Sequence, residues 1–142
     1  MDADKGGLVE GALSDAVIGA FFDVYNELGP GFLESVYENS MAIALREAGL
    51  AVVQQAGIQV RYRGRVVGEY RADLLVEGRM MVEIKAASTL APGHDAQLIN
   101  YLKASGLVVG LLLNFGPRPQ FKRRILSDRS IRDHPRKSVA KK

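Results

Sequence analysis

Apolar side chains recur every three to four positions in two segments near the N-terminus, residues 8–28 and about residues 33–48. This spacing is typical of amphipathic helices that bury one face. A Gly-Pro-Gly turn at residues 29–31 ends the first segment, and Gly49 ends the second. The pattern therefore predicts two consecutive helices. Tyr37 falls on the apolar face of the second, where we expect its ring to pack in the core and its hydroxyl to find a partner.

The rest of the chain consists of short apolar runs and one further helical segment. Turns rich in glycine and proline separate them, and one run is apolar at nearly every position, which suits a buried central strand. The predicted elements are strands at residues 52–62, 66–76 and 80–86, a helix at 94–104, a buried strand at 107–115 and a short basic edge strand at 121–126. The order α-α-β-β-β-α-β-(β) predicts an α/β (α+β) fold with a mixed central sheet flanked by helices.

A length of 142 residues suits one domain with a substantial core. We expect that domain to span residues 1–126, and we expect residues 127–142 to form a basic, flexible C-terminal tail. The two ends differ in charge: residues 1–47 hold nine acidic and two basic residues, whereas residues 118–142 hold ten basic and two acidic ones. A basic end can bind a polyanion such as nucleic acid, although a solubilising, disordered tail is the simpler interpretation.

Composition argues against several classes of protein. The chain has no cysteine, which rules out disulfides and thiolate metal sites and is compatible with a reducing cytoplasm. With only two histidines, His94 and His134, a multi-histidine zinc site is not expected. No apolar run reaches the roughly 18 residues that a membrane helix needs, and the acidic N-terminus is unlike a signal peptide. We therefore expect a cytoplasmic protein without a membrane segment.

One predicted hairpin carries charged residues at positions where core strands carry none. Its sequence, EYRADLLVEGRMMVEIKA, contains Asp73, Glu83 and Lys85 in the pattern D-x9-E-x-K. Glu83 and Lys85 are two apart, so they share one face of their strand. A three-residue turn at 77–79 would place Asp73 opposite Glu83, with Cβ atoms about 5 Å apart. We predict that turn, or a bulge that has the same effect.

Two carboxylates so close together repel each other, and three arrangements would relieve the repulsion. One carboxyl group is protonated, Lys85 bridges the pair, or a divalent cation lies between them. Oxygen ligands without histidine or cysteine suit Mg²⁺ or Mn²⁺. A water on such an ion, with the lysine beside it, could attack a phosphodiester. The simpler interpretation is that Asp73, Glu83 and Lys85 form the solvated face of an exposed sheet.

Three motifs, taken in order, give the sequence a resemblance to a known family. They are G-x-x-E-x-x-Y at residues 31–37, D-x9-E-x-K at residues 73–85 and Q-x-x-x-Y at residues 97–101. Over roughly residues 10–126 they resemble the GxxExxY proteins, a small bacterial family of the PD-(D/E)XK nuclease superfamily. The resemblance implies a restriction-endonuclease-like core with the acidic motif on a central hairpin. Ala72 stands where the superfamily's name has proline, a position that varies widely among such nucleases.

The resemblance also implies roles for individual residues. Asp73 and Glu83 resemble the metal-binding carboxylates, the Ile84 backbone carbonyl a further ligand, and Lys85 the catalytic lysine. Glu34 resembles the helix glutamate that joins or supports such a site. The alternative role for Glu34, which needs no family resemblance, is to stabilise the N-terminus of its helix.

The same resemblance suggests which residues contact nucleic acid. Gln97 and Tyr101 resemble a pair that places the nucleic-acid strand in the superfamily's exonuclease-like branch. They are four apart and share a helix face, although an ordinary amphipathic helix would have them too. Lys122, Arg123 and Arg124 belong to the basic C-terminal region that would follow the phosphate backbone.

The sequence therefore supports two hypotheses. The first is a metal-dependent nuclease that hydrolyses phosphodiester bonds of nucleic acid, with DNA favoured and Mg²⁺ or Mn²⁺ as cofactor. A nuclease core of this size often needs a second copy, as a homodimer, or a larger nuclease complex to act on both strands. The second is a non-catalytic module that keeps the fold and binds nucleic acid or protein. In that case Asp73 and Glu83 are structural.

Overall fold

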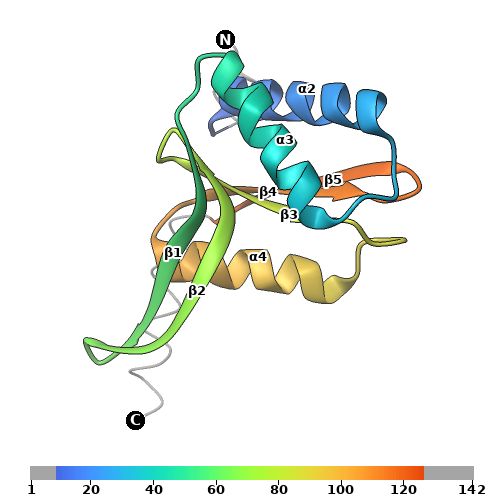
Figure 1. Ribbon diagram of the computed structural model, residues 1–142. Coiled ribbons are helices and arrows are strands. Elements are labelled where there is room, and N and C mark those ends of the chain that lie inside the picture. The colour runs from blue at the N-terminus through green and yellow to red at the C-terminus, as the bar shows by residue number, and fades with distance from the viewer. Residues whose placement is uncertain (1–8, 127–142) are drawn as a thin grey trace.

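The computed structural model describes residues 9–126, and within them the chain forms three helices and five strands (Figure 1). The elements are α2 (Gly11–Leu28), α3 (Glu34–Glu47), β1 (Val52–Tyr62), β2 (Arg65–Val76), β3 (Met80–Lys85), α4 (Pro92–Ser105), β4 (Val109–Phe115) and β5 (Pro119–Ile125). The predicted element order and the predicted α+β class are confirmed. The predicted tail at residues 127–142 lies outside the described residues.

The strands form one mixed sheet in the order β1-β2-β3-β4-β5. β3 and β4 are parallel, and the other neighbouring pairs are antiparallel. A parallel pair needs a long crossover connection, which α4 supplies here. The basic strand β5 lies at the edge of the sheet, as the sequence predicted.

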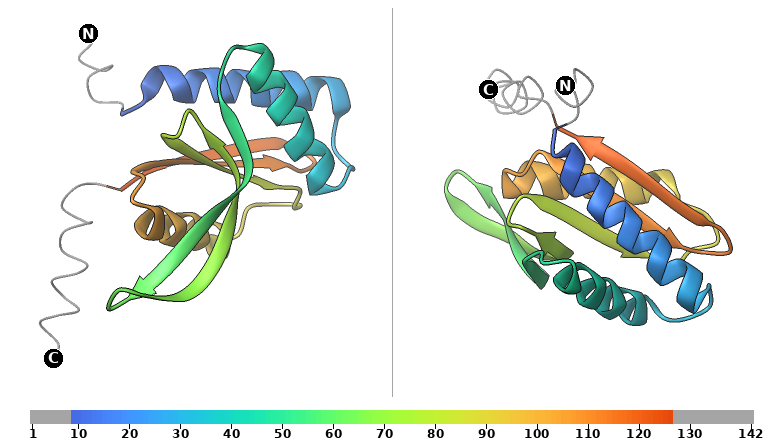
Figure 2. Two further views of the ribbon diagram at one scale, coloured as in Figure 1. Left: turned by 60° about the vertical axis from the view of Figure 1, so that its left-hand side comes forward. Right: turned by 90° about the horizontal axis from the view of Figure 1, so that it is seen from above.

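Helices cover both faces of the sheet. α2 and α3 pack on one face and α4 packs on the other, as Figures 1 and 2 show from three directions. Every residue of β4 is buried, in agreement with its nearly continuous apolar sequence. None of the helices described in residues 9–126 is long and apolar enough to cross a membrane.

Two proline-containing ends differ from the sequence-based prediction. α4 begins at Pro92 rather than at His94, and β5 begins at Pro119 rather than at Phe121. At the first helical position the missing N–H of proline costs nothing and its fixed φ suits the helix. At the start of an edge strand the missing donor is tolerated for the same reason.

The turn between β2 and β3 fixes which residues face each other. β2 ends at Val76 and β3 begins at Met80, so the turn has three residues, as predicted. The paired positions include Leu74 with Val82 and Leu75 with Met81. This is the register that brings Asp73 opposite Glu83.

β2 changes layers at Asp73. Leu74 packs in the core cluster with α2 and α3, whereas Ala72 packs in the cluster with α4. In a regular strand, side chains two apart share a face, so the strand is twisted or bent between them. Gln55, on the neighbouring strand between the two pairs that flank Asp73, has a left-handed backbone with a φ of 53°. Such a conformation is costly for a non-glycine residue and is often found at functional sites.

The motif tyrosine Tyr37 holds the connection between α2 and α3. Its hydroxyl donates to the Gly29 carbonyl over 2.6 Å and accepts the Phe32 N–H over 3.1 Å. Its ring is fully buried and stacks on Phe115 with a centroid distance of 4.3 Å. The expected core role of Tyr37 is therefore confirmed, and the tyrosine fixes the turn from which α3 starts at Glu34.

Replacing Tyr37 with phenylalanine should test this anchor. Tyr37→Phe leaves the buried ring in place but removes the partner of the Gly29 carbonyl and of the Phe32 N–H. We expect the free energy of unfolding to fall by about 1–3 kcal/mol, measured by urea denaturation. Tyr62→Phe is the control, because Tyr62 is 57% exposed. Equal stability of the two variants would contradict the assignment.

Candidate metal centre

Asp73 and Glu83 are joined by reciprocal hydrogen bonds across two strands. The Asp73 N–H donates to Glu83 Oε2 over 3.0 Å, and the Ile84 N–H donates to Asp73 Oδ2 over 2.7 Å. The backbone pairing of β2 with β3 runs only from Val76 to Leu74, so the two carboxylates accept N–H groups just beyond the point where it stops. Each side chain is thereby fixed in position by the other strand.

Glu83 is a buried acid, with only 4% of its surface exposed. The pKa of its carboxyl is raised to about 8. Burial away from water is the largest cause and the nearby charge of Asp73 the next, while the Asp73 N–H and the charge of Lys85 act in the opposite direction. The interpretation of these residues as a solvated sheet face is therefore wrong for Glu83. Without a cation, protonation of Glu83 is the simplest way to remove the repulsion between the two carboxylates.

Lys85 does not bridge the two carboxylates. Its Nζ donates to Gln97 Oε1 on α4 over 3.4 Å, and no carboxylate within the described ranges pairs with it inside 4.0 Å. Gln97 Nε2 in turn donates to the Tyr101 hydroxyl over 3.1 Å. A polar chain therefore runs from β3 to α4. It brings together three candidate residues from two motifs, Lys85 from the acidic hairpin and the Gln97–Tyr101 pair from α4.

Glu34 lies beside the end of β3. It is the first residue of α3, and its Oε2 accepts the Ala86 N–H over 3.3 Å. The buried Asn114 of β4 holds the next residue, because it accepts the Ala87 N–H over 2.8 Å and donates to the Ala87 carbonyl over 3.0 Å. The chain that follows Lys85 is thus fixed from two sides, and Glu34 supports the site from the helix.

The sequence analysis missed Glu38, one turn after Glu34 on α3. Its two carboxylate oxygens accept hydrogen bonds from Gln54 and Gln55 over 3.0 and 2.7 Å. Gln55 also donates to Asp73 Oδ1 over 3.3 Å, and the charge of Glu38 contributes to the raised pKa of Glu83. The i, i+4 spacing of the two glutamates, which puts them on one helix face, was the available signal.

The basic residues of β5 lie away from the carboxylates. Lys122 pairs with Leu112, which pairs with Glu83, so two strand spacings of about 5 Å separate Lys122 from Glu83. Arg123 donates to Ser14 and to the Val9 carbonyl. Arg124 forms an ion pair with Asp95 over 2.6 Å. The two guanidinium groups therefore have protein partners, and the expected contact of these residues with nucleic acid stays a prediction.

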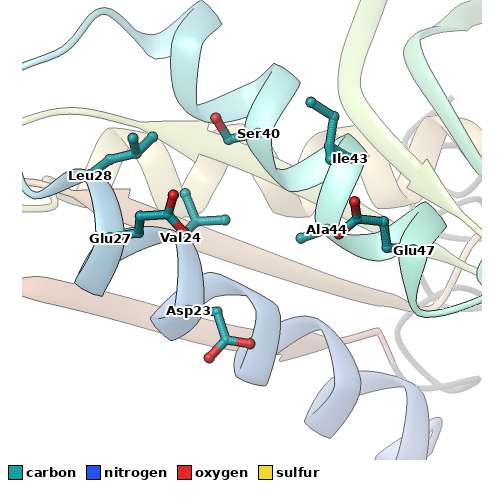
Figure 3. A pocket seen from close by; sticks show the side chains of 8 residues that line it. All are labelled: Asp23, Val24, Glu27, Leu28, Ser40, Ile43, Ala44 and Glu47. Atoms are coloured by element: carbon teal, nitrogen blue, oxygen red, sulfur yellow. The ribbon is translucent and has the colours of Figure 1, made fainter.

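A hollow lies between α2 and α3, on the face of the sheet that α4 does not cover (Figure 3). It has a volume of about 370 Å³ and is lined by the carboxylates Asp23, Glu27 and Glu47 around an apolar floor. The three carboxylates are exposed. Their charge would repel a polyanion, so this hollow does not suit a nucleic acid.

The ligand atoms that Asp73 and Glu83 offer suit a hard cation. All are carboxylate oxygens, and a cation would offset the negative charge that burial disfavours at Glu83. Over residues 9–126, no cluster of three or more acidic or histidine side chains is gathered closely enough to hold a metal. The chain would thus supply two carboxylates, and Mg²⁺ commonly keeps several waters when it binds so few protein ligands.

The raised pKa of Glu83 predicts how stability depends on pH when metal is removed. Between the ordinary value of 4.5 and about 8, the folded protein binds more protons than the unfolded chain. The free energy of unfolding should therefore fall as the pH rises through this range, by up to about 1.4 kcal/mol per pH unit. Glu83→Gln cannot titrate and should show a flatter dependence in urea denaturation with a chelator present. Parallel curves for parent and variant would contradict the prediction.

Comparison with known proteins shows the family and the fold of the chain. A model of the PD-(D/E)XK nuclease superfamily matches residues 11–125. The crystal structure of SSO0001 has a similar fold, with a TM-score of 0.50 and 17% sequence identity; the match covers 75% of this chain and 57% of that one. A search of curated proteins finds no match. The family match includes the α3 motif, the acidic hairpin and the polar chain to α4, and the chain belongs to the PD-(D/E)XK nuclease superfamily.

Proposed function

We propose that this protein is a metal-dependent nuclease that hydrolyses phosphodiester bonds. The observation that carries the proposal is the meeting of Asp73 and Glu83 across β2 and β3, with Lys85 on the same strand as Glu83. Membership of the superfamily supports a nucleic-acid substrate. The ordered motifs further favour the GxxExxY branch, with DNA as the preferred substrate.

Asp73 and Glu83 would hold Mg²⁺ or Mn²⁺, with the Ile84 carbonyl as a further oxygen donor. When bound, such an ion supplies a water of lowered pKa and neutralises charge on the phosphate. Lys85 lies two residues after Glu83, and its ammonium group would stabilise the charge that develops on the phosphate oxygens. The Lys85–Gln97 hydrogen bond would keep that ammonium group directed away from the carboxylates until the substrate arrives.

Glu34 would act as a positioning residue. It holds the Ala86 N–H, so it fixes the backbone immediately after the lysine. The basic residues of β5 and of the C-terminal segment would attract the phosphate backbone, and a second copy or a larger complex would allow both strands of a duplex to be cut. The role of Glu34 rests on its hydrogen bond to Ala86, and the role of the basic residues rests on their charge.

One observation favours a second candidate function. The reciprocal hydrogen bonds of Asp73 and Glu83 already give both carboxylates partners, and a protonated Glu83 would make the pair stable without a metal. On this reading the protein binds nucleic acid or protein and cleaves nothing. The two functions differ in whether Mg²⁺ binds, and this difference can be measured directly.

Metal binding should stabilise the parent and not the Asp73→Asn variant. A Mg²⁺ concentration ten times the dissociation constant adds about 1.4 kcal/mol to the free energy of unfolding, which is a few degrees in melting temperature. We expect this gain, together with cleavage of labelled DNA, in the parent and in Asp23→Asn. Asp23 is an exposed carboxylate of the α2–α3 hollow and is the matched control. A parent without any Mg²⁺-dependent gain would favour the binding module.

Lys85→Met should separate chemistry from metal binding. The lysine is not a ligand in this proposal, so the melting-temperature gain with Mg²⁺ should remain while the cleavage rate falls by about 10²-fold or more. Lys85→Arg keeps the positive charge, so its cleavage rate should fall less than that of Lys85→Met. If Lys85→Met cleaves as fast as the parent, Lys85 has no catalytic role.

A further inference from the structure

A groove with a volume of about 830 Å³ lies between α4 and the hairpin of β1 and β2. The hairpin reaches beyond the rest of the sheet and past α4, as Figure 1 shows, because the part of β2 before Leu74 has no partner in β3. Gln59, Arg61 and Tyr70 line the groove from the hairpin side. Gln97, Tyr101 and Lys103 line it from the helix.

Two tyrosine rings form a wall of this groove. Tyr70 of β2 and Tyr101 of α4 lie with their centroids 5.4 Å apart, and Tyr70 is 49% exposed. Tyr70 belongs to none of the motifs in the sequence. An exposed aromatic face in a groove is a stacking surface for a planar ring, and nucleobases stack on such faces with little regard to sequence.

The charge of the groove suits a polyanion. Its charged lining residues are Arg61 and Lys103, and the described lining contains no carboxylate. Residues 59–71 of the hairpin carry further arginines at positions 63, 65 and 71, against one acidic residue, Glu69. Amide side chains of Gln59, Gln97 and Asn100 add donors and acceptors that can reach base edges. The α2–α3 hollow, with three carboxylates, has the opposite character.

One residue, Gln97, links the groove to the candidate metal centre. Gln97 lines the groove and also accepts the hydrogen bond from Lys85. A nucleic-acid strand lying in the groove would therefore lead to the lysine and the two carboxylates.

The exposed tyrosine face favours an unpaired base. In a duplex the bases are stacked on one another, so a tyrosine ring can stack only on a base that has left the duplex stack.

We propose that this groove binds single-stranded nucleic acid, with an unpaired base stacked on Tyr70 and the adjoining phosphates held by Arg61 and Lys103. The proposal deepens the proposed nuclease function and rests on it for the direction of the strand toward the carboxylates. It adds the substrate class, single-stranded or locally opened nucleic acid, and a binding residue on β2. DNA and RNA share this chemistry and are separate arms of the test.

The test is binding of labelled oligonucleotides measured by fluorescence anisotropy, with a chelator present so that no cleavage occurs. Single-stranded DNA, single-stranded RNA and the matching duplexes are compared. Tyr70→Ala should weaken single-strand binding about five- to hundred-fold, the usual effect of removing one stacked aromatic ring. Tyr70→Phe should bind like the parent. Tyr62→Ala is the matched control, because Tyr62 lies on the same hairpin, is 57% exposed and does not line the groove.

The outcomes separate this proposal from the nuclease proposal. Equal effects of Tyr70→Ala and Tyr62→Ala, or duplex binding as tight as single-strand binding, would overturn the groove assignment even if the parent cleaves DNA in Mg²⁺. Tyr70-dependent single-strand binding without cleavage by the parent in Mg²⁺ or Mn²⁺ would support the groove and overturn the nuclease. Thermal melting of Tyr70→Ala, which changes a half-exposed side chain, should match that of the control within a few degrees.

Discussion

The rest of the site depends on how two carboxylates are accommodated inside the sheet. Where β2 turns away from β3, Asp73 and Glu83 accept N–H groups across the gap between the strands. An N–H donor favours the charged form of a carboxylate, but burial disfavours it, and the pKa of about 8 at Glu83 shows that burial dominates. The same atoms therefore join the strands and concentrate negative charge. A proton or a cation must offset that charge, and this requirement links the fold to the chemistry.

The change of layer at Asp73 has a second consequence. Before this residue, β2 pairs only with β1, so the two strands continue as a hairpin whose inner face meets α4. Two-stranded ribbons twist more strongly than wide sheets, which lets this hairpin turn toward the helix. The carboxylates thus lie at the point of the bend, and the groove with Tyr70 lies immediately beyond it. The left-handed backbone of Gln55 on β1 is a local cost of this geometry.

The sequence predicted the features that depend on residue spacing and on the periodicity of apolar positions. The three-residue turn followed from the spacing of Asp73 and Glu83, and the buried strand β4 from its continuous apolar run. Sequence patterns could not predict the bend at Asp73 or the left-handed backbone of Gln55, because both result from packing against helices on opposite faces of the sheet. Tyr70 was missed because its neighbour Tyr101 is distant in sequence. Glu38 had a local signal in its spacing from Glu34, but its partners Gln54 and Gln55 are distant in sequence.

Gln97 links the two parts of the candidate site. Its side-chain oxygen accepts from Lys85 over 3.4 Å, a long and therefore weak hydrogen bond, and its amide nitrogen donates to Tyr101. A base or phosphate that bonded Gln97 from the groove would compete for these atoms and leave the Lys85 ammonium group without its partner. An ammonium group released beside two carboxylates and a phosphate would reorient toward the charge. Under the groove proposal, occupation of the groove and the position of the lysine would therefore be coupled through the side-chain amide of Gln97.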